Sequence, residues 1–259
     1  MEYFSTRDTA PRLTASEAIS RGLAPDGGLF VPDTLPQIGE AELAALLPLG
    51  YGERAKRILA AYLPEYSDAE LEALVSASYG NNFDTEAIAP VRFTDDTTGY
   101  LELWHGPTSA FKDMALQMLP HLLTASLKKC GEQRGVCILV ATSGKAALEG
   151  FADVPGTKIL VFYPRDGVSD VQRLQMVTQT GENVGVCAVE GNFDDAQTGV
   201  KRIFGDRELA EKLSAKGWFL SSANSINWGR LLPQIAYYFS AYCDFVNSGH
   251  IKLGERVVF

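Results

Sequence analysis

The fold class of this chain is indicated by the stretch Val136-Cys137-Ile138-Leu139-Val140-Ala141-Thr142-Ser143-Gly144. Its first six residues are all apolar, which is typical of a strand buried on both faces of a parallel sheet. Further short apolar runs lie at 158–163, 184–189 and 255–259, and stretches with helical spacing separate them. This alternation predicts an α/β fold: an open, mostly parallel sheet with crossover helices.

The N-terminal part of the chain follows a different pattern. Thr14-Ala15-Ser16-Glu17 and Ser67-Asp68-Ala69-Glu70 each fit a capping box, in which a hydroxyl and a carboxylate satisfy free amides at a helix start. Gly22 and Gly80 are expected to end these two helices. The sequence therefore predicts a helical N-terminal domain at 1–90 and an α/β domain at 91–259.

Composition limits the partners of the protein. The 259 residues carry a formal net charge of -9, with an isoelectric point near 4.9. Nucleic acids and anionic membranes are polyanions and are not expected partners. No apolar run approaches the roughly 20 residues of a transmembrane helix.

The four cysteines, Cys130, Cys137, Cys187 and Cys243, lack the paired spacing of metal ligands. Cys137 and Cys187 lie in apolar runs, and we expect both thiols to be buried. Buried, unpaired thiols predict a reducing, cytoplasmic location.

A second informative stretch is His105-Gly106-Pro107-Thr108-Ser109-Ala110-Phe111-Lys112-Asp113. Thr108 or Ser109 is expected to cap a helix that begins here, which places Lys112 in its first turn. The helix dipole and burial beside Phe111 then favour the neutral amine. A neutral lysine amine can attack a carbonyl and form a Schiff base. From the residues alone, a surface lysine pointing into water is the stronger interpretation.

Two further loops are candidates for binding anions. Thr142-Ser143-Gly144 follows a buried strand, where hydroxyls and amides can hold a carboxylate, although an ordinary strand-to-helix turn explains it equally well. Asn224-Ser225-Ile226-Asn227-Trp228-Gly229-Arg230 opens a helix, so its amides and guanidinium can converge on a phosphate. On residue types alone, Asn227 is a helix cap and Arg230 an exposed charge.

The stretch around Lys112 has the form H-G-P-T-x-x-F-K-D. Other motifs, in chain order, are Tyr3-Phe4-Ser5-Thr6-Arg7, Gly22-Leu23-Ala24-Pro25-Asp26-Gly27-Gly28-Leu29-Phe30-Val31-Pro32, Leu148-Glu149-Gly150-Phe151-Ala152-Asp153, Phe162-Tyr163-Pro164, Gly191-Asn192-Phe193-Asp194-Asp195-Ala196-Gln197 and Asn224 to Arg230. In this order they resemble the motifs of the threonine synthases, pyridoxal-phosphate enzymes of fold type II and relatives of the tryptophan synthase β chain.

The resemblance implies an activity and a set of site residues. Lys112 would carry pyridoxal 5'-phosphate, and the enzyme would convert O-phospho-L-homoserine and water to L-threonine and phosphate, a carbon-oxygen lyase reaction in threonine biosynthesis. The residues implied to hold the cofactor are Lys112, Ser143 and Gly144; those implied to bind substrate are Thr142, Ser143, Asn224, Ser225, Asn227 and Arg230.

Two departures from the family pattern qualify this expectation. Three loop residues usual in the family are absent between Gly144 and Lys145, and we expect them to be omitted from the sequence rather than deleted. The chain ends at Val257-Val258-Phe259, where the family continues into a loop that holds the cofactor phosphate. About the second half of the family's length is therefore expected to be missing, and with it tight cofactor binding. The alternatives are a related fold-type-II lyase or dehydratase, and an inactive fragment or binding module.

Overall fold

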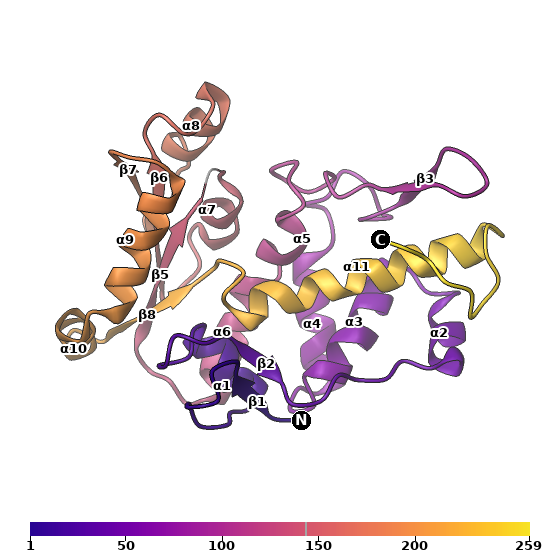
Figure 1. Ribbon diagram of the computed structural model, residues 1–259, viewed down its shortest axis with the longest axis horizontal. Coiled ribbons are helices and arrows are strands. Elements are labelled where there is room, and N and C mark those ends of the chain that lie inside the picture. Colours follow the sequence, from indigo (N-terminus) through magenta and orange to yellow (C-terminus); the bar gives the residue numbers. More distant parts are fainter. Residues whose placement is uncertain (143) are drawn as a thin grey trace.

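A parallel sheet forms the centre of the computed structural model, which describes residues 1–142 and 144–259 (Figure 1). Its strands are β5 (Gly135–Ala141), β6 (Thr157–Pro164), β7 (Val184–Val189) and β8 (Trp218–Ser222), in the order β7-β6-β5-β8. All pair in parallel, with Ile138 opposite Ile159 in β6 and Ser221 in β8. Three of the predicted strands are confirmed.

Helices form the crossovers between these strands. They are α7 (Ala146–Phe151), α8 (Asp170–Val177), α9 (Phe193–Gly205) and α10 (Arg207–Ala215). Ala196 and Val200 of α9 pack on Leu139 and Ala141 of β5, while α7 packs against β6. Figure 1 shows α9 and α7 on opposite sides of the sheet. The predicted α/β class is therefore confirmed.

The apolar run at 255–259 is not a strand, so that prediction was wrong. Its last ring, Phe259, packs edge-on against Tyr238 at 5.1 Å between centroids, and Val258 is 94% exposed. The fourth strand of the sheet is β8, whose backbone pairs with residues 135–139 of β5. Apolar composition favours a strand only where a partner strand is available.

The expected burial of Cys187 was also wrong. Cys187 is exposed and Cys137 is half-buried, although both lie in strands as expected. The reason is position: β7 is an edge strand, so fewer neighbours cover its side chains.

The N-terminal part is helical, as predicted. A ribbon of β1 (Tyr3–Ser5) and β2 (Phe30–Pro32) accompanies α1 (Ala15–Arg21), α2 (Glu40–Leu46), α3 (Tyr51–Tyr62) and α4 (Asp68–Ser78). Both capping boxes are present, at Thr14 and Ser67. Gly22 follows α1 with φ 75°, the left-handed conformation that glycine adopts without strain.

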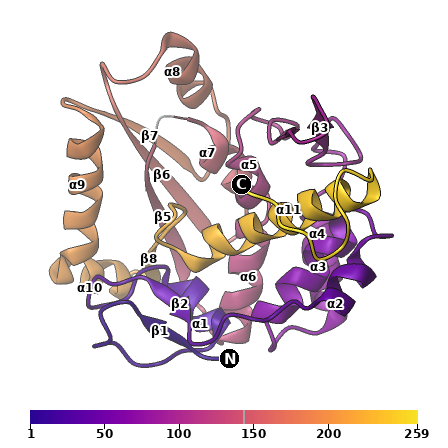
Figure 2. The same cartoon turned by 45° about the vertical axis from the view of Figure 1, so that its right-hand side comes forward.

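The second part of the chain adds a ribbon of β3 (Val91–Phe93) and β4 (Gly99–Leu101), and the helices α5 (Asp113–Leu116), α6 (Leu119–Lys129) and α11 (Trp228–Asn247). Helix α1 packs on α6, and α3 packs on α11, which Figure 2 shows running beside it. Across the described residues, no helix has both the length and the apolarity needed to cross a membrane.

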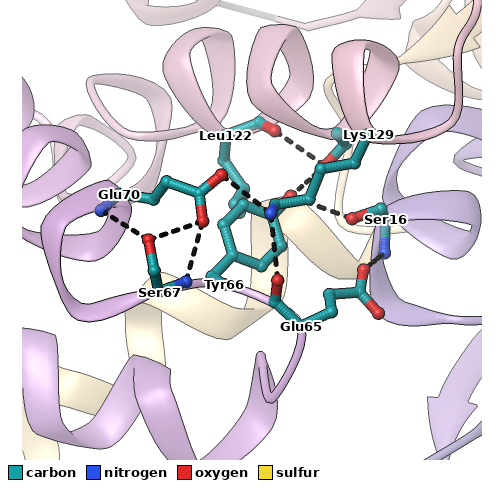
Figure 3. Close-up of polar contacts among 8 residues, drawn as sticks. Ser16, Glu65, Tyr66, Ser67, Glu70, Leu122 and Lys129 are labelled. Carbon is teal, nitrogen blue, oxygen red and sulfur yellow. Dashed lines mark hydrogen bonds and ion pairs between the residues drawn. The ribbon is translucent and has the colours of Figure 1, made fainter.

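A polar network fastens the N-terminal helices to α6 (Figure 3). The Tyr66 hydroxyl lies 2.7 Å from the Ser126 hydroxyl and accepts a bond from Ser16 at 3.2 Å. The Lys129 ammonium donates to the Glu65 carbonyl at 2.9 Å and pairs with Glu70 at 2.7 Å. Burial raises the pKa of Tyr66 to about 12, so its phenol stays protonated. Because the two parts also share one hydrophobic core, a domain boundary near residue 90 stays a prediction.

Candidate active site

The Lys112 loop, residues 106–112, leads into a helix that begins later than the sequence predicts. Helix α5 starts at Asp113, and Lys112 is its N-cap residue, with no side-chain cap. Neither Thr108 nor Ser109 caps the helix; Thr108 instead donates from its hydroxyl to the Asp113 carboxylate at 2.7 Å. The helix also stops at Leu116 and a new one, α6, carries Pro120 in its first turn. Proline cannot donate the backbone bond that a continuous helix needs there.

The Lys112 side chain lines a cavity of about 170 Å³ at the carboxyl ends of β5 and β8. Ligands in open parallel sheets bind at this edge, because loops and helix N-termini converge there. The polar lining residues are Lys112, Thr142, Asn224, Ser225 and Arg230, and the remainder are Leu116, Val140, Ala141, Ala147, Phe193 and Ala223. The structure thus brings together five of the predicted site residues.

Two cations meet in this cavity. Burial and the nearby Arg230 charge lower the pKa of Lys112, which favours the neutral, nucleophilic amine. Arg230 is only 3% exposed, and burial lowers its pKa too. Its guanidinium donates to Gln234 and lies 6.0 Å from the Phe111 ring, but no carboxylate pairs with it within the described part of the chain. A buried cation without an acidic partner favours an anionic ligand.

The two asparagines of the Asn224 to Arg230 loop have different environments. The Asn224 amide donates to the Ala141 carbonyl at 3.2 Å, while its Oδ1 is buried without a hydrogen-bond partner among the described residues. Asn227 is fully engaged: Oδ1 caps α11 at Gly229 N, and Nδ2 donates to the Ile19 and Ser222 carbonyls. Asn227 does not line the cavity, so its geometry is that of the helix cap, and substrate binding by Asn227 stays a prediction.

The strand-to-helix loop contributes Thr142 to the cavity. Its Oγ1 accepts a bond from the Gly144 amide at 3.4 Å, but Gly144 itself is not part of the lining. Ser143 lies outside the described residues. Ser225 is exposed at the rim of the cavity.

Sequence reasoning missed the apolar wall of the cavity. Phe193, 39% exposed, begins α9 and faces the same space as Leu116 and Ala147. The Asn192 cap places Phe193 at the helix start, and this was the available signal for it.

His105 lies outside the cavity lining and has a different environment. Its Nδ1 is 2.5 Å from Asp84 and its Nε2 is 2.9 Å from Glu102. Partial burial lowers the pKa of His105, but the bonds to Glu102 and Asp84 outweigh it and raise the pKa above the usual value. This arrangement is that of a structural link between loops.

Comparison with known proteins adds to this geometry. Residues 2–79 match the family model described as Threonine synthase N terminus. The chain is 43% identical to threonine synthase of Pseudomonas aeruginosa, over 93% of this chain and 50% of that protein. It is 42% identical to human threonine synthase-like 1, over 93% of this chain and 34% of that protein.

Solved structures give the same result. A pyridoxal-phosphate-bound threonine synthase from Brucella melitensis has a TM-score of 0.82 and 40% identity, over 95% of this chain and 52% of that one. Yeast threonine synthase has a TM-score of 0.81 and 36% identity, over 95% and 50%. The chain thus spans about half the length of these threonine synthases. By sequence and by fold, the chain is similar to the threonine synthases over about half of their length, and its residues 2–79 match the model of their N-terminal region.

Proposed function

We propose that this protein acts in the threonine synthase reaction, in which O-phospho-L-homoserine and water give L-threonine and phosphate. The observation that carries this proposal is the pairing of a half-buried amine, Lys112, with a buried guanidinium, Arg230, in one cavity. An amine of lowered pKa suits capture of an aldehyde, and an unpaired buried cation suits a phosphate. The choice of O-phospho-L-homoserine as substrate rests on the resemblance to the threonine synthases.

The residues also fit pyridoxal phosphate as a cofactor. When bound, this cofactor supplies an electron sink for carbanions of the amino-acid substrate. Lys112 Nζ would hold the aldehyde, and Ser143 and Gly144 are the proposed contacts from the strand-to-helix loop. As a free amine, Lys112 Nζ would remove protons from the α and β carbons of the substrate and would return protons at the γ and α carbons, because the γ carbon of O-phospho-L-homoserine becomes the methyl group of threonine.

The remaining polar groups of the cavity suit the substrate. Arg230 would bind the phosphate that leaves, and the free Oδ1 of Asn224 could accept a bond from a substrate N–H group. Thr142 and Ser225 hydroxyls are proposed to bind further polar atoms of the substrate, with Asn227 fixing the helix start. At about 170 Å³ the cavity is smaller than the roughly 300–1,000 Å³ usual for small-molecule sites, so we expect weak cofactor binding by this chain alone.

We include a cytoplasmic location in this proposal, because the cysteines of the described chain are free thiols. The partners proposed are small anionic molecules, with no nucleic acid and no membrane.

Product identity tests the proposal. The protein is incubated with pyridoxal phosphate and O-phospho-L-homoserine, and amino acid, keto acid and phosphate are each quantified. We expect threonine and phosphate in equal amounts, abolished by Lys112→Arg and retained by the control Lys201→Arg, which changes an exposed lysine of α9. A keto acid as the main product would contradict the proposal and favour a related lyase.

A further inference from the structure

Asp113, which follows Lys112, fixes the conformation of the Lys112 loop by hydrogen bonds. Asp113 is fully buried, and its two carboxylate oxygens accept bonds from Thr108: from the backbone amide at 2.8 Å and from the hydroxyl at 2.7 Å. One side chain therefore closes the five-residue loop that leads to the lysine. No basic side chain pairs with Asp113 within the part of the chain that the structure describes. Its hydrogen-bonding capacity is directed at Thr108.

The rest of the loop is shaped around this carboxylate. A Cβ added at Gly106 would lie 2.5 Å from the Asp113 Cβ, so only glycine allows the loop to approach so closely. Ser109 adopts φ 54°, a left-handed conformation that is unfavourable for a residue other than glycine. A strained conformation persists only where surrounding contacts fix it.

The helix after the lysine is fixed from the opposite side. The Tyr79 hydroxyl donates to the Met114 carbonyl at 2.7 Å, and Met114 and Leu116 are buried in the core. Lys112 thus lies between a loop closed by Asp113 and a helix held by Tyr79, and its side chain is left to extend into the cavity.

We propose that Asp113 is a positioning residue for Lys112, acting through its paired hydrogen bonds to Thr108. This inference rests on the proposed function, in which Lys112 is the reactive amine. Asp113 does not line the cavity, so its effect is through the backbone of the loop. Without the two bonds, the loop relaxes and the lysine amine reaches water.

Two substitutions separate geometry from charge. Asp113→Asn keeps the shape: its carbonyl oxygen can accept from the Thr108 amide, and its NH₂ group can donate to the Thr108 hydroxyl once that hydroxyl turns. Asp113→Ala loses both bonds. A positioning role therefore predicts that the asparagine variant resembles the wild type and that the alanine variant does not.

The test measures the reactivity of Lys112 in the 259-residue chain without cofactor. Lysines are acetylated competitively at a series of pH values, and each site is quantified by mass spectrometry, with exposed Lys201 as the internal reference. In Asp113→Ala we expect the pH midpoint of Lys112 acetylation to rise, because the amine gains access to water. We also expect the Thr108 amide to exchange hydrogen at least about tenfold faster, the change expected when a bond to a charged group is lost. Asp113→Asn should keep the wild-type midpoint. Thr124→Val, which removes a hydroxyl bond to a backbone carbonyl in α6, is the matched control and should leave the Lys112 profile unchanged.

Thr108→Val is a milder variant that tests the same proposal if Asp113→Ala fails to fold. It removes the bond from the Thr108 hydroxyl to Asp113 and leaves the bond from the Thr108 amide. We expect a smaller shift in the same direction, and restoration by Thr108→Ser. An unchanged Lys112 midpoint in the folded Asp113→Ala or Thr108→Val variant would overturn the proposal, and so would an asparagine variant that behaves like alanine. Because no cofactor is used, failure of Lys112 to capture pyridoxal phosphate would contradict the proposed function and leave this result intact.

Discussion

Gly150 in α7 makes one of the closest helix contacts near the site, and it supports a quantitative prediction. A Cβ at this position would lie 2.3 Å from the Leu116 carbonyl oxygen and 3.1 Å from its carbonyl carbon. Leu116 ends α5 and lines the cavity beside Lys112. Because the opposing atoms belong to the backbone, no side-chain rotation can relieve the contact. Gly150→Ala must therefore push α5 and α7 apart.

The size of the effect follows from two opposing terms. Overpacking of this kind costs about 1–3 kcal/mol, whereas replacing glycine by alanine inside a helix contributes about 1 kcal/mol of stability. Gly199 in α9 supplies the control, since it is exposed and a Cβ there meets nothing within 4 Å. Gly199→Ala should be stabilised by the higher helix propensity of alanine and should carry no steric cost. The difference in unfolding free energy between the two variants therefore gives the steric cost at Gly150, about 1–3 kcal/mol.

Urea unfolding followed by far-ultraviolet circular dichroism measures both variants. We expect the unfolding midpoint to rise for Gly199→Ala and to lie clearly lower for Gly150→Ala, at unchanged slope. Equal midpoints for the two variants would refute the close approach of α5 and α7 and with it the placement of Leu116 at the cavity.

Three other perturbations test separate parts of the structure. His105→Gln should lower the free energy of unfolding most below about pH 6.5, where the His105 ring is protonated and its bonds to carboxylates stabilise the fold. The difference in unfolding free energy between wild type and variant should shrink as the pH rises through the raised pKa of His105. A difference that grows with pH in urea titrations would contradict this. Asn227→Ala should cost about 2–4 kcal/mol in urea unfolding, because a helix cap and two buried carbonyl bonds are lost together. The Asn192 side chain only caps α9, so the control substitution Asn192→Ala should cost about 1 kcal/mol of unfolding free energy. Similar costs at both positions would show that the bonds from Asn227 to the two carbonyls do not stabilise the fold. Arg230→Met should raise the melting temperature while abolishing stabilisation by added inorganic phosphate, because an unpaired buried cation costs stability that an anion restores. A variant that melts lower and still responds to phosphate would contradict the anion site.

Local features were predictable from the sequence. The capping boxes at Thr14 and Ser67 involve residues three positions apart, so neither depends on the rest of the fold. The run at 136–141 forms a central strand in which every residue except half-buried Cys137 is buried, and its continuous apolar character follows from that position.

Features that depend on distant partners were not predictable. The runs at 218–222 and 255–259 are both partly apolar, but only the first pairs with β5, some 80 residues earlier in the chain. Thr108 does not cap a helix for a similar reason. Its hydroxyl donates to the carboxylate of Asp113, whose position is fixed by burial in the core.

The candidate site was predictable only in part. Lys112, Thr142, Asn224, Ser225 and Arg230 line one cavity, and their binding of cofactor or substrate stays a prediction. The apolar wall of the cavity carries no chemical signature in the sequence, because alanine, leucine and valine occupy core positions throughout the chain.

We propose that Lys112 is the amine that captures the cofactor aldehyde. Pyridoxal phosphate is added to the 259-residue chain, borohydride makes any lysine link permanent, and peptides are mapped by mass spectrometry with and without excess inorganic phosphate. We predict that Lys112 is labelled ahead of the exposed lysines, such as Lys201, and that Arg230→Gln reduces this preference. Equal labelling of all exposed lysines, with Lys112 unmodified, would contradict this role of Lys112.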